Sequence, residues 1–274
     1  MGEMMITSRD NQLARRARAV REGKIREQIF VEGVRLCEEA VRSALSVEQV
    51  ICTEKLARDE RGAQLLQSLS DRPAHLSFVT EEVFASLSDT KTPQGILLLA
   101  ARPFTGREAL ERAAASVPLL IVMHRLNNPS NAGAILRTAE AAGVTGCVLT
   151  EGTTDIFSPK ALRGAMGSSF RVPVWAGARW AEVLEWCGEH GIRTVCADPG
   201  ARLSHTELEW TAPRALIVGA EAAGLRPDEI AAADEALRIP MRAPVESLNV
   251  AVATAVVLYE AARQRELWTK EVKN

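Results

Sequence analysis

The second half of the chain alternates short apolar segments with helix-forming ones. The apolar segments are rich in Val, Ile and Leu and cover residues 118–124, 144–150, 171–176, 192–198, 214–220 and 236–241. Helical patterns near 131–142, 158–166, 179–190 and 227–233 separate them. Apolar strands that alternate with helices indicate a mostly parallel sheet covered on both faces. Ligands of such α/β sheets bind beside the carboxyl ends of the strands, so we expect site residues in the loops that follow them.

Residues 1–103 also alternate helical and strand-like segments and end with an apolar strand at 95–103. This pattern predicts a smaller α/β domain with helices packed on a sheet. Residues 104–116 are typical of a helical or flexible linker, so residues 117–274 form the second domain. A chain of 274 residues is long enough for each domain to bury its own core.

Charge is unevenly distributed, although the formal net charge is only -2. Between Arg9 and Arg35, eight basic residues accompany four acidic ones. Residues 9–28 of this stretch are helix-prone. A basic helix of this kind either presents a solvated charged face or contacts nucleic-acid phosphates. The five cysteines include no C-x-x-C pair and stand mostly in apolar surroundings, which indicates reduced, buried thiols.

Several classes of protein are excluded or disfavoured. The N-terminal residues have no signal-peptide pattern, and the longest apolar run is far too short to span a bilayer, so we expect a cytoplasmic protein without a membrane segment. The four histidines do not cluster, which argues against a metal site. A nucleotide-dependent oxidoreductase is disfavoured because the second half has no G-x-G-x-x-G fingerprint.

Three stretches place polar side chains just after a strand. The first, LNNPSNAGAILRTA (126–139), contains Asn131, which we interpret as a helix N-cap, and Arg137 in the second turn of a mostly apolar helix. A guanidinium there suits an anion such as a phosphate, although a surface or salt-bridging arginine is the alternative.

The second stretch, ALIVGAEAAGL (215–225), has Gly219 at the strand end and a lone carboxylate at Glu221. The third, IPMRAPVESLNV (239–250), is a proline-bearing loop that leads into an apolar helix, predicted to begin near Ser247 and to be a buried anchor. Ser247 and Asn249 lie at the mouth of this unit. Each stretch alone is compatible with an ordinary turn or cap, but a structural role for all three at once is much less plausible.

Taken together, the three stretches resemble the signature motifs of the SpoU (TrmH-like) RNA ribose 2′-O-methyltransferases of the SPOUT superfamily. NAGAILRTA, GAEAAG and IPM followed by ESLNV stand in the family's order within residues 117–262. SPKALRGAMGSSFRVPV (158–174) is similar to a segment of the family's ribosomal-RNA branch. The resemblance implies a deep trefoil knot in the C-terminal domain. It also implies that residues 1–103 form a substrate-binding domain of ribosomal-protein L30e type, with FVEG (30–33) as a local marker.

The resemblance further implies the cofactor, the partners and the site. S-adenosylmethionine would bind in the knot, no metal would be required, and the protein would be a homodimer with its active site at the subunit interface. The implied cofactor-binding residues are Ala197, Gly219, Ile239, Met241 and Leu248. The implied catalytic residues are Asn131, Arg137, Glu221, Ser247 and Asn249. A guanidinium holds its proton in proteins, so we expect Arg137 to clamp the substrate phosphate rather than to act as a base.

The expected substrate is structured RNA, and 23S ribosomal RNA is the first choice because tRNA-specific relatives generally lack the front domain. tRNA, and ribosomal RNA methylated to protect it from a drug, remain alternatives. The main alternative from another class is a non-catalytic RNA-binding or ribosome-assembly factor on the same scaffold. Binding of S-adenosylmethionine discriminates between an enzyme and such a factor.

Overall fold

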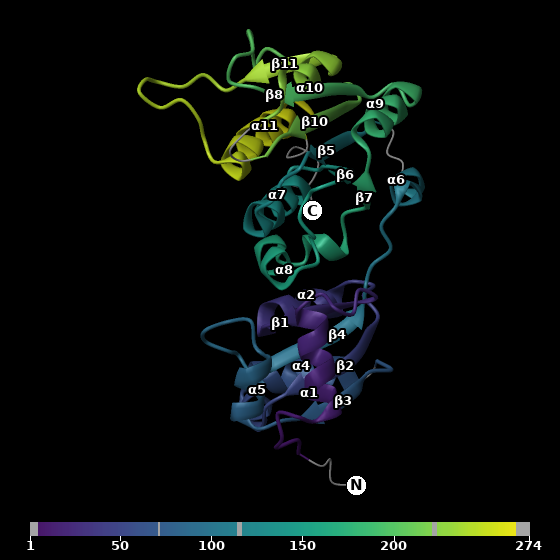
Figure 1. The fold of residues 1–274 in the computed structure, drawn as a ribbon, viewed down its shortest axis with the longest axis vertical. Coiled ribbons are helices and arrows are strands. Elements are labelled where there is room, and N and C mark those ends of the chain that lie inside the picture. Colours follow the sequence, from purple (N-terminus) through teal and green to yellow (C-terminus); the bar gives the residue numbers. More distant parts are fainter. Residues whose placement is uncertain (1–4, 71, 114–116, 221–223, 267–274) are drawn as a thin grey trace. The chain divides into compact units, whose positions relative to one another are not determined.

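The computed structural model describes residues 5–70, 72–113, 117–220 and 224–266, and the chain divides into two compact units (Figure 1). Unit 1 comprises Met1–Pro103 and Ile156–Arg171, and unit 2 comprises Phe104–Asp155 and Val172–Asn274. The sequence predicted a single boundary within 104–116. The structure instead groups residues 156–171 with unit 1, because Arg171 pairs with Glu39 at 2.6 Å and Arg163 pairs with Asp89 at 2.8 Å.

Unit 1 contains a four-stranded sheet in the order β1-β4-β2-β3. Its strands are β1 (Gln28–Glu32), β2 (Val47–Cys52), β3 (His75–Phe78) and β4 (Ile96–Ala101). β4 is antiparallel to both of its neighbours, whereas β2 and β3 are parallel. Its helices are α1 (Gln12–Arg21), α2 (Val34–Arg42), α3 (Glu54–Arg58), α4 (Glu60–Ser70), α5 (Glu81–Leu87), α8 (Pro159–Ala165) and the 3-10 turn η1 (Ser168–Phe170).

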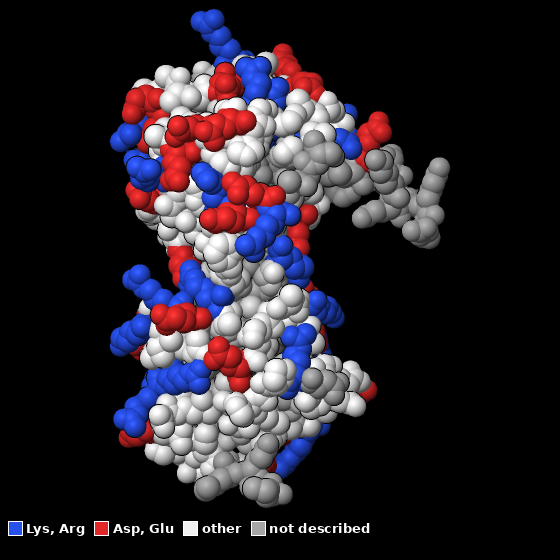
Figure 2. All heavy atoms as spheres, turned by 90° about the vertical axis from the view of Figure 1, so that its right-hand side faces the viewer, with Lys and Arg blue, Asp and Glu red and all other residues white. Residues whose placement is uncertain are grey.

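Helix α1 uses both of its faces within unit 1. Ala14, Ala17 and Val20 recur at helical spacing and pack into the core with side chains of β1 and β4. On the polar face, Arg16 bonds Glu48 at 2.8 Å, and Arg21 donates to the carbonyl of Leu87 at 2.8 Å, near the end of α5. Two of the basic side chains for which phosphate contact was one alternative, Arg16 and Arg21, are therefore engaged inside the unit. Figure 2 shows side chains of both signs on the face that it draws.

Unit 2 contains a seven-stranded sheet in the order β7-β6-β5-β10-β8-β11-β9, in which each pair of neighbours is parallel. This confirms the predicted parallel sheet. The strands are β5 (Leu119–Met123), β6 (Gly146–Thr150), β7 (Val174–Ala178), β8 (Arg193–Ala197), β9 (Leu203–Ser204), β10 (Arg214–Val218) and β11 (Glu235–Arg238). The helices are α6 (Arg107–Arg112), α7 (Pro129–Ala141), α9 (Trp180–Glu189), α10 (Pro227–Ala232) and α11 (Val250–Gln264).

Helices cover both faces of this sheet. Val183 and Trp186 of α9 pack against the inward-facing residues of β5, β6 and β10, among them Val122 and Ile217. Helices α7 and α11 pack against each other on the opposite side (Figure 1). This sandwich arrangement fixes the loops at the carboxyl ends of the strands on a rigid base.

Three details differ from the sequence predictions. Helix α7 is capped by Asn128 with Pro129 in its first turn, so Asn131 lies inside the helix and is not its N-cap. Helix α11 begins at Val250 rather than near Ser247, because the side chain of Asn249 caps it. Helix α11 is also not buried on all sides, since Val252, Val256 and Tyr259 are exposed.

The five cysteines are buried and free, as predicted. Burial raises the pKa of Cys196 to about 12, and the charge of Asp198 adds to the effect. None of the helices in the described ranges has both the length and the apolar composition that crossing a bilayer requires.

Candidate active site

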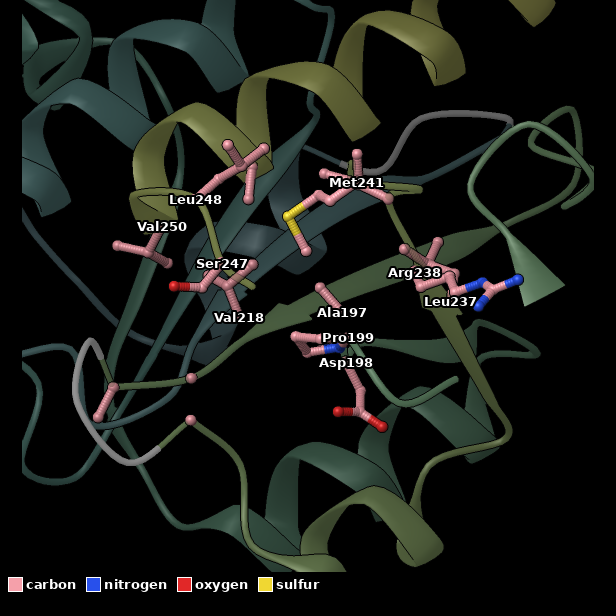
Figure 3. Close-up of a pocket in the computed structure, with 15 residues that line it drawn as sticks. Ala197, Asp198, Pro199, Val218, Leu237, Arg238, Met241, Ser247, Leu248 and Val250 are labelled. Atoms are coloured by element: carbon pink, nitrogen blue, oxygen red, sulfur yellow. The ribbon is translucent and has the colours of Figure 1, made fainter. Parts of the chain in front are cut away.

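A pocket of about 180 Å³ lies at the carboxyl ends of β8, β10 and β11 (Figure 3). The chain reaches it four times, through the ends of these three strands and through the segment that leads into α11. This is the position at which parallel α/β sheets bind their ligands. The lining residues are Ala197, Asp198, Pro199, Val218, Gly219, Ala220, Gly224, Leu237, Arg238, Ile239, Met241, Ser247, Leu248, Val250 and Ala253.

The pocket is mainly apolar, with few polar side chains at its edge. Figure 3 shows Met241 and Leu248 along one wall, and Ala197 and Pro199 opposite them. The carboxylate of Asp198 is one of the few polar groups in the lining. A mainly apolar pocket with a small number of polar groups is typical of a site for a small organic ligand.

All five residues that the sequence predicted to bind a cofactor lie in this lining. Ala197 ends β8, Gly219 follows β10, and Ile239 and Met241 follow β11, while Leu248 precedes α11. The structure thus brings together residues that lie as far apart in sequence as Ala197 and Leu248. Their role toward a cofactor stays a prediction.

Gly219 is required by a close approach of two backbone segments. A Cβ atom at this position would lie 2.7 Å from the carbonyl carbon of Gly224 and 2.9 Å from the nitrogen of Leu225. The Gly224 N–H donates to the carbonyl of Ala220 at 2.9 Å, which closes the turn. Any residue with a side chain at position 219 would therefore displace the backbone of Gly224 and Leu225 beside the pocket.

The first and third motif stretches meet through two asparagines. The Asn249 side-chain amide donates to Oδ1 of Asn131 at 3.2 Å. The Oδ1 atom of Asn249 accepts from the N–H groups of Ala251 at 2.9 Å and Val252 at 3.4 Å, so the same side chain caps α11. One residue thereby fixes the start of α11 and its position against α7.

The remaining predicted catalytic residues are placed as follows. Ser247 lines the pocket and is exposed. Arg137 is exposed on α7, outside the pocket lining, and forms no hydrogen bond or ion pair with the part of the chain that the structure describes. Glu221 lies outside the described residues. Within the described ranges, no group of three or more His, Cys, Asp or Glu side chains is arranged to hold a metal ion.

A buried polar cluster next to the first motif was missed from the sequence. Glu229 of α10 is 2% exposed and accepts from the guanidinium of Arg125 at 2.8 Å, from the Arg226 N–H at 2.8 Å and from the ring of His124 at 3.1 Å. His124 and Arg125 directly follow β5, so Glu229 joins the loop of the first motif to the helix after the second. The only signal in the sequence was the pair His124-Arg125 at the end of an apolar strand.

The cluster shifts the ionisation of its members. Burial raises the pKa of Glu229, but the bonds from Arg226 and His124, together with the neighbouring positive charges, outweigh it, so the pKa lies below the ordinary value. Burial lowers the pKa of His124, and the opposing effect of Glu229 does not restore it. The cluster therefore favours a carboxylate beside a neutral imidazole.

Comparisons with known proteins agree with this geometry. Residues 118–259 match the model of the SpoU rRNA Methylase family, and residues 11–98 match that of the MRM3-like substrate binding domain. The chain is 32% identical over 263 residues to an uncharacterized tRNA/rRNA methyltransferase of Synechocystis sp., with 95% of this chain and 94% of the relative covered.

Two further similarities concern a named enzyme and a solved structure. The chain is 31% identical over 230 residues to the 23S rRNA (guanosine(2553)-2′-O)-methyltransferase RlmP of Bacillus subtilis, covering 84% of this chain and 86% of that protein. The crystal structure of the SpoU methyltransferase AviRb from Streptomyces viridochromogenes, in complex with the cofactor AdoMet, superposes with a TM-score of 0.84 at 24% identity, covering 93% of this chain and 98% of that one. The expected SPOUT-type α/β fold is thereby confirmed. On the family match and the similarity along nearly the whole chain, this protein belongs to the SpoU rRNA methylase family.

Proposed function

We propose that this protein transfers a methyl group from S-adenosylmethionine to the 2′-hydroxyl of a ribose in 23S ribosomal RNA. The observation that carries the proposal is the pocket at the ends of β8, β10 and β11, whose lining includes described residues of the second and third family motifs. The Asn249–Asn131 hydrogen bond ties this pocket to the helix that carries the first motif. RlmP, the named relative, is a 23S rRNA methyltransferase, and we propose the cytoplasm as the place of action.

The pocket residues fit S-adenosylmethionine. Leu237, Met241 and Leu248 offer apolar surface for an adenine ring, and Gly219, which has no side chain, lets the backbone of Gly224 approach closely beside them. We assign the cofactor to Ala197, Gly219, Ile239, Met241 and Leu248. The bound cofactor would supply an electrophilic methyl group on a sulfonium.

The protein residues then hold and orient the acceptor. Aligning the ribose oxygen for in-line attack can contribute about 7–11 kcal/mol in well-oriented systems. Arg137, which has no partner of its own in the described ranges, would hold the adjacent phosphate and stabilise the developing alkoxide. Asn131 and Asn249 would keep the first and third motifs in register, and Glu221 and Ser247 would help to shape the site and hold the third loop.

We also propose that the protein is a homodimer formed through α11. Val252, Val256 and Tyr259 recur at helical spacing on α11 and are 50%, 36% and 46% exposed in the single chain, and Leu248, which precedes the helix, is 39% exposed. A stripe of this size on one helix is typical of a protein interface. A second copy would cover the stripe and complete a site whose loop, residues 242–249, is exposed in the single chain. The knot and the L30e-type origin of unit 1 remain predictions.

A single-turnover assay with Arg137→Ala tests the assignment. The variant should bind S-adenosylmethionine as the wild type does in calorimetry, yet methylate 23S ribosomal RNA at least about a hundredfold more slowly, as after loss of one preorganised donor. Methylation within a few-fold of the wild type would remove Arg137 from the reaction. Failure of the wild type to bind S-adenosylmethionine would favour a non-catalytic RNA-binding factor.

A further inference from the structure

Unit 1 contains a cavity of its own, separate from the pocket described above. It has a volume of about 280 Å³ and lies between the start of α2, the loop that joins α5 to β4, and α8. The side chains that matter for its chemistry are Arg35, Thr90, Thr92, Gln94 and Arg163.

Two hydrogen-bonded anchors hold the α5–β4 loop against β1 and α2. The buried carboxylate of Glu32 accepts from the N–H of Asp89 at 2.8 Å and from the hydroxyl of Thr90 at 3.0 Å, and it also accepts from the hydroxyl of Ser88. At the other end of the loop, Gln94 Oε1 accepts from the N–H of Val34 at 2.9 Å. The cavity wall is therefore held at both ends by bonds within the protein.

Gly33 permits this close fit. Its φ is 99°, a conformation that side-chain-bearing residues rarely adopt, and a Cβ atom there would lie 3.1 Å from Gln94 Oε1. The FVEG segment thus acts locally: its glutamate and its glycine together position the α5–β4 loop.

The cavity presents donors rather than acceptors. Arg35 and Thr92 are exposed and form no hydrogen bond or ion pair with the described residues, and Gln94 uses its oxygen but not its amide N–H groups. Arg163 donates from Nη2 to Asp89 at 2.8 Å, whereas its Nη1 is buried without a hydrogen-bond partner in the described ranges. Glu32, which also lines the cavity, is engaged by the loop, and the nearby Asp89 is engaged by Arg163. An anionic ligand rich in acceptors fits this arrangement.

We propose that this cavity binds a phosphate and the adjoining unpaired nucleotide of the RNA substrate. Arg35 would contact the phosphate, and Thr92 and the amide of Gln94 would donate to the sugar or the base edge, as proteins do with splayed nucleotides of structured RNA. The inference rests on the proposed function, since it takes RNA as the substrate. It places an RNA contact on α2 and the α5–β4 loop, whereas Arg16 and Arg21 of α1 are engaged within unit 1.

Binding of full-length 23S ribosomal RNA transcript to the full chain, measured at several salt concentrations, tests the proposal. Arg35→Gln should weaken binding by about three- to tenfold and reduce the salt slope by about 0.7, the value for one lost single-strand phosphate contact. Gln94→Glu keeps the acceptor for Val34 but replaces the donor with a negative oxygen, so it should weaken binding at least as much. Arg35→Lys should restore most of the affinity.

Arg58→Gln is the matched control, because Arg58 is also an arginine of unit 1, with its side chain 79% exposed, and it does not line the cavity. Equal effects of Arg35→Gln and Arg58→Gln, or no RNA binding by the wild type, would overturn the inference. Calorimetry with S-adenosylmethionine on the same samples separates the two proposals. Loss of RNA affinity with normal cofactor binding supports the cavity. If the wild type does not bind the cofactor, the proposed methylation is wrong. The RNA affinities of Arg35→Gln and Arg58→Gln can still be compared in that case, and they still test the cavity.

Discussion

At the scale of single residues, the candidate site depends on positions where one atom decides the local geometry. Gly219 has no room for a side chain because Gly224 and Leu225 approach its backbone. Asn249 uses both ends of its amide, one to cap α11 and the other to reach Asn131. Gly219 determines the shape of the pocket, and Asn249 determines how the first and third motifs are positioned. Variants of the two residues should therefore change different measured properties.

Gly219→Ala should weaken binding of S-adenosylmethionine by about tenfold or more, equivalent to about 1.4 kcal/mol, because the added methyl group displaces the turn that lines the pocket. Titration calorimetry measures the effect. Gly188→Ala serves as the control, since a Cβ atom there meets nothing within 4 Å. Equal affinities of both variants would show that the turn at 219 is not part of the cofactor site.

Asn249→Ala should lose about 1 kcal/mol of unfolding free energy through the missing helix cap, and should also lose methylation activity. Asn249→Asp keeps the cap acceptor but cannot donate to Asn131. It should retain most of the stability while methylating at least about tenfold more slowly, because the motifs lose their register. Chemical denaturation and a methylation assay on both variants make the comparison. An Asp variant with full activity would restrict Asn249 to a capping role.

At the scale of elements, Glu229 couples the end of β5 to α10. It receives bonds from His124, Arg125 and Arg226, which lie on both sides of the pocket's second motif along the chain. A buried carboxylate with several donors is strongly destabilising to remove, because its partners are left without a counter-charge. The cluster should therefore control both stability and its pH dependence.

Glu229→Gln should lower the unfolding free energy by about 3 kcal/mol at pH 7. The folded-state pKa values of His124 and Glu229 both lie below their ordinary values of 6.5 and 4.5. The folded state therefore gains its full stability from these two groups above their ordinary pKa values. As the pH falls, this stability is lost first below 6.5, when His124 takes up a proton, and then below 4.5, when Glu229 does. Denaturation curves at pH 7 and pH 3 should show the difference between wild type and variant shrinking at low pH. A constant difference would mean that the carboxylate is not the source.

The elements of unit 2 were largely predictable, and the misplacements have local causes. The apolar strands predict a buried parallel sheet, and the structure confirms it. The sequence prediction of Asn131 as the N-cap of α7 is wrong because Pro129, at the first helical position, places the start of the helix directly after Asn128. The Glu229 cluster could not be predicted, because a single glutamate in a short helix gives no sign of partners more than 100 residues away.

At the scale of the whole molecule, the apolar side chains Val252, Val256 and Tyr259 of α11 are left exposed by the part of the chain that the structure describes. Val252→Glu places a charge in the middle of this stripe and should convert a dimer into a monomer. Light scattering coupled to size-exclusion chromatography measures the change, with Val117→Glu as the control, since Val117 is 38% exposed and lies outside the stripe. A monomeric wild type, or a dimeric Val252→Glu variant, would contradict the proposed interface.

The sequence predicted two α/β regions, but not that residues 156–171 would belong with the first. In that region α8 packs on β1, and ion pairs such as Arg171–Glu39 join residues far apart in sequence, contacts that leave no periodic pattern. The basic α1 shows the same limit: charge counts could not reveal that Arg21 is used to bond carbonyls of α5. The apolar core of each region could be predicted from the sequence, whereas the polar contacts between residues far apart in the chain could not.

The most direct test of the proposed function is nucleoside analysis of 23S ribosomal RNA after incubation with the protein and S-adenosylmethionine carrying a deuterated methyl group. RNA from a strain that lacks the gene provides an unmodified substrate. We predict that the label appears in one 2′-O-methylated nucleoside and that Arg137→Ala abolishes most of it. Label on a base, or no label under conditions in which the protein binds the RNA, would contradict ribose methylation as the activity of this protein.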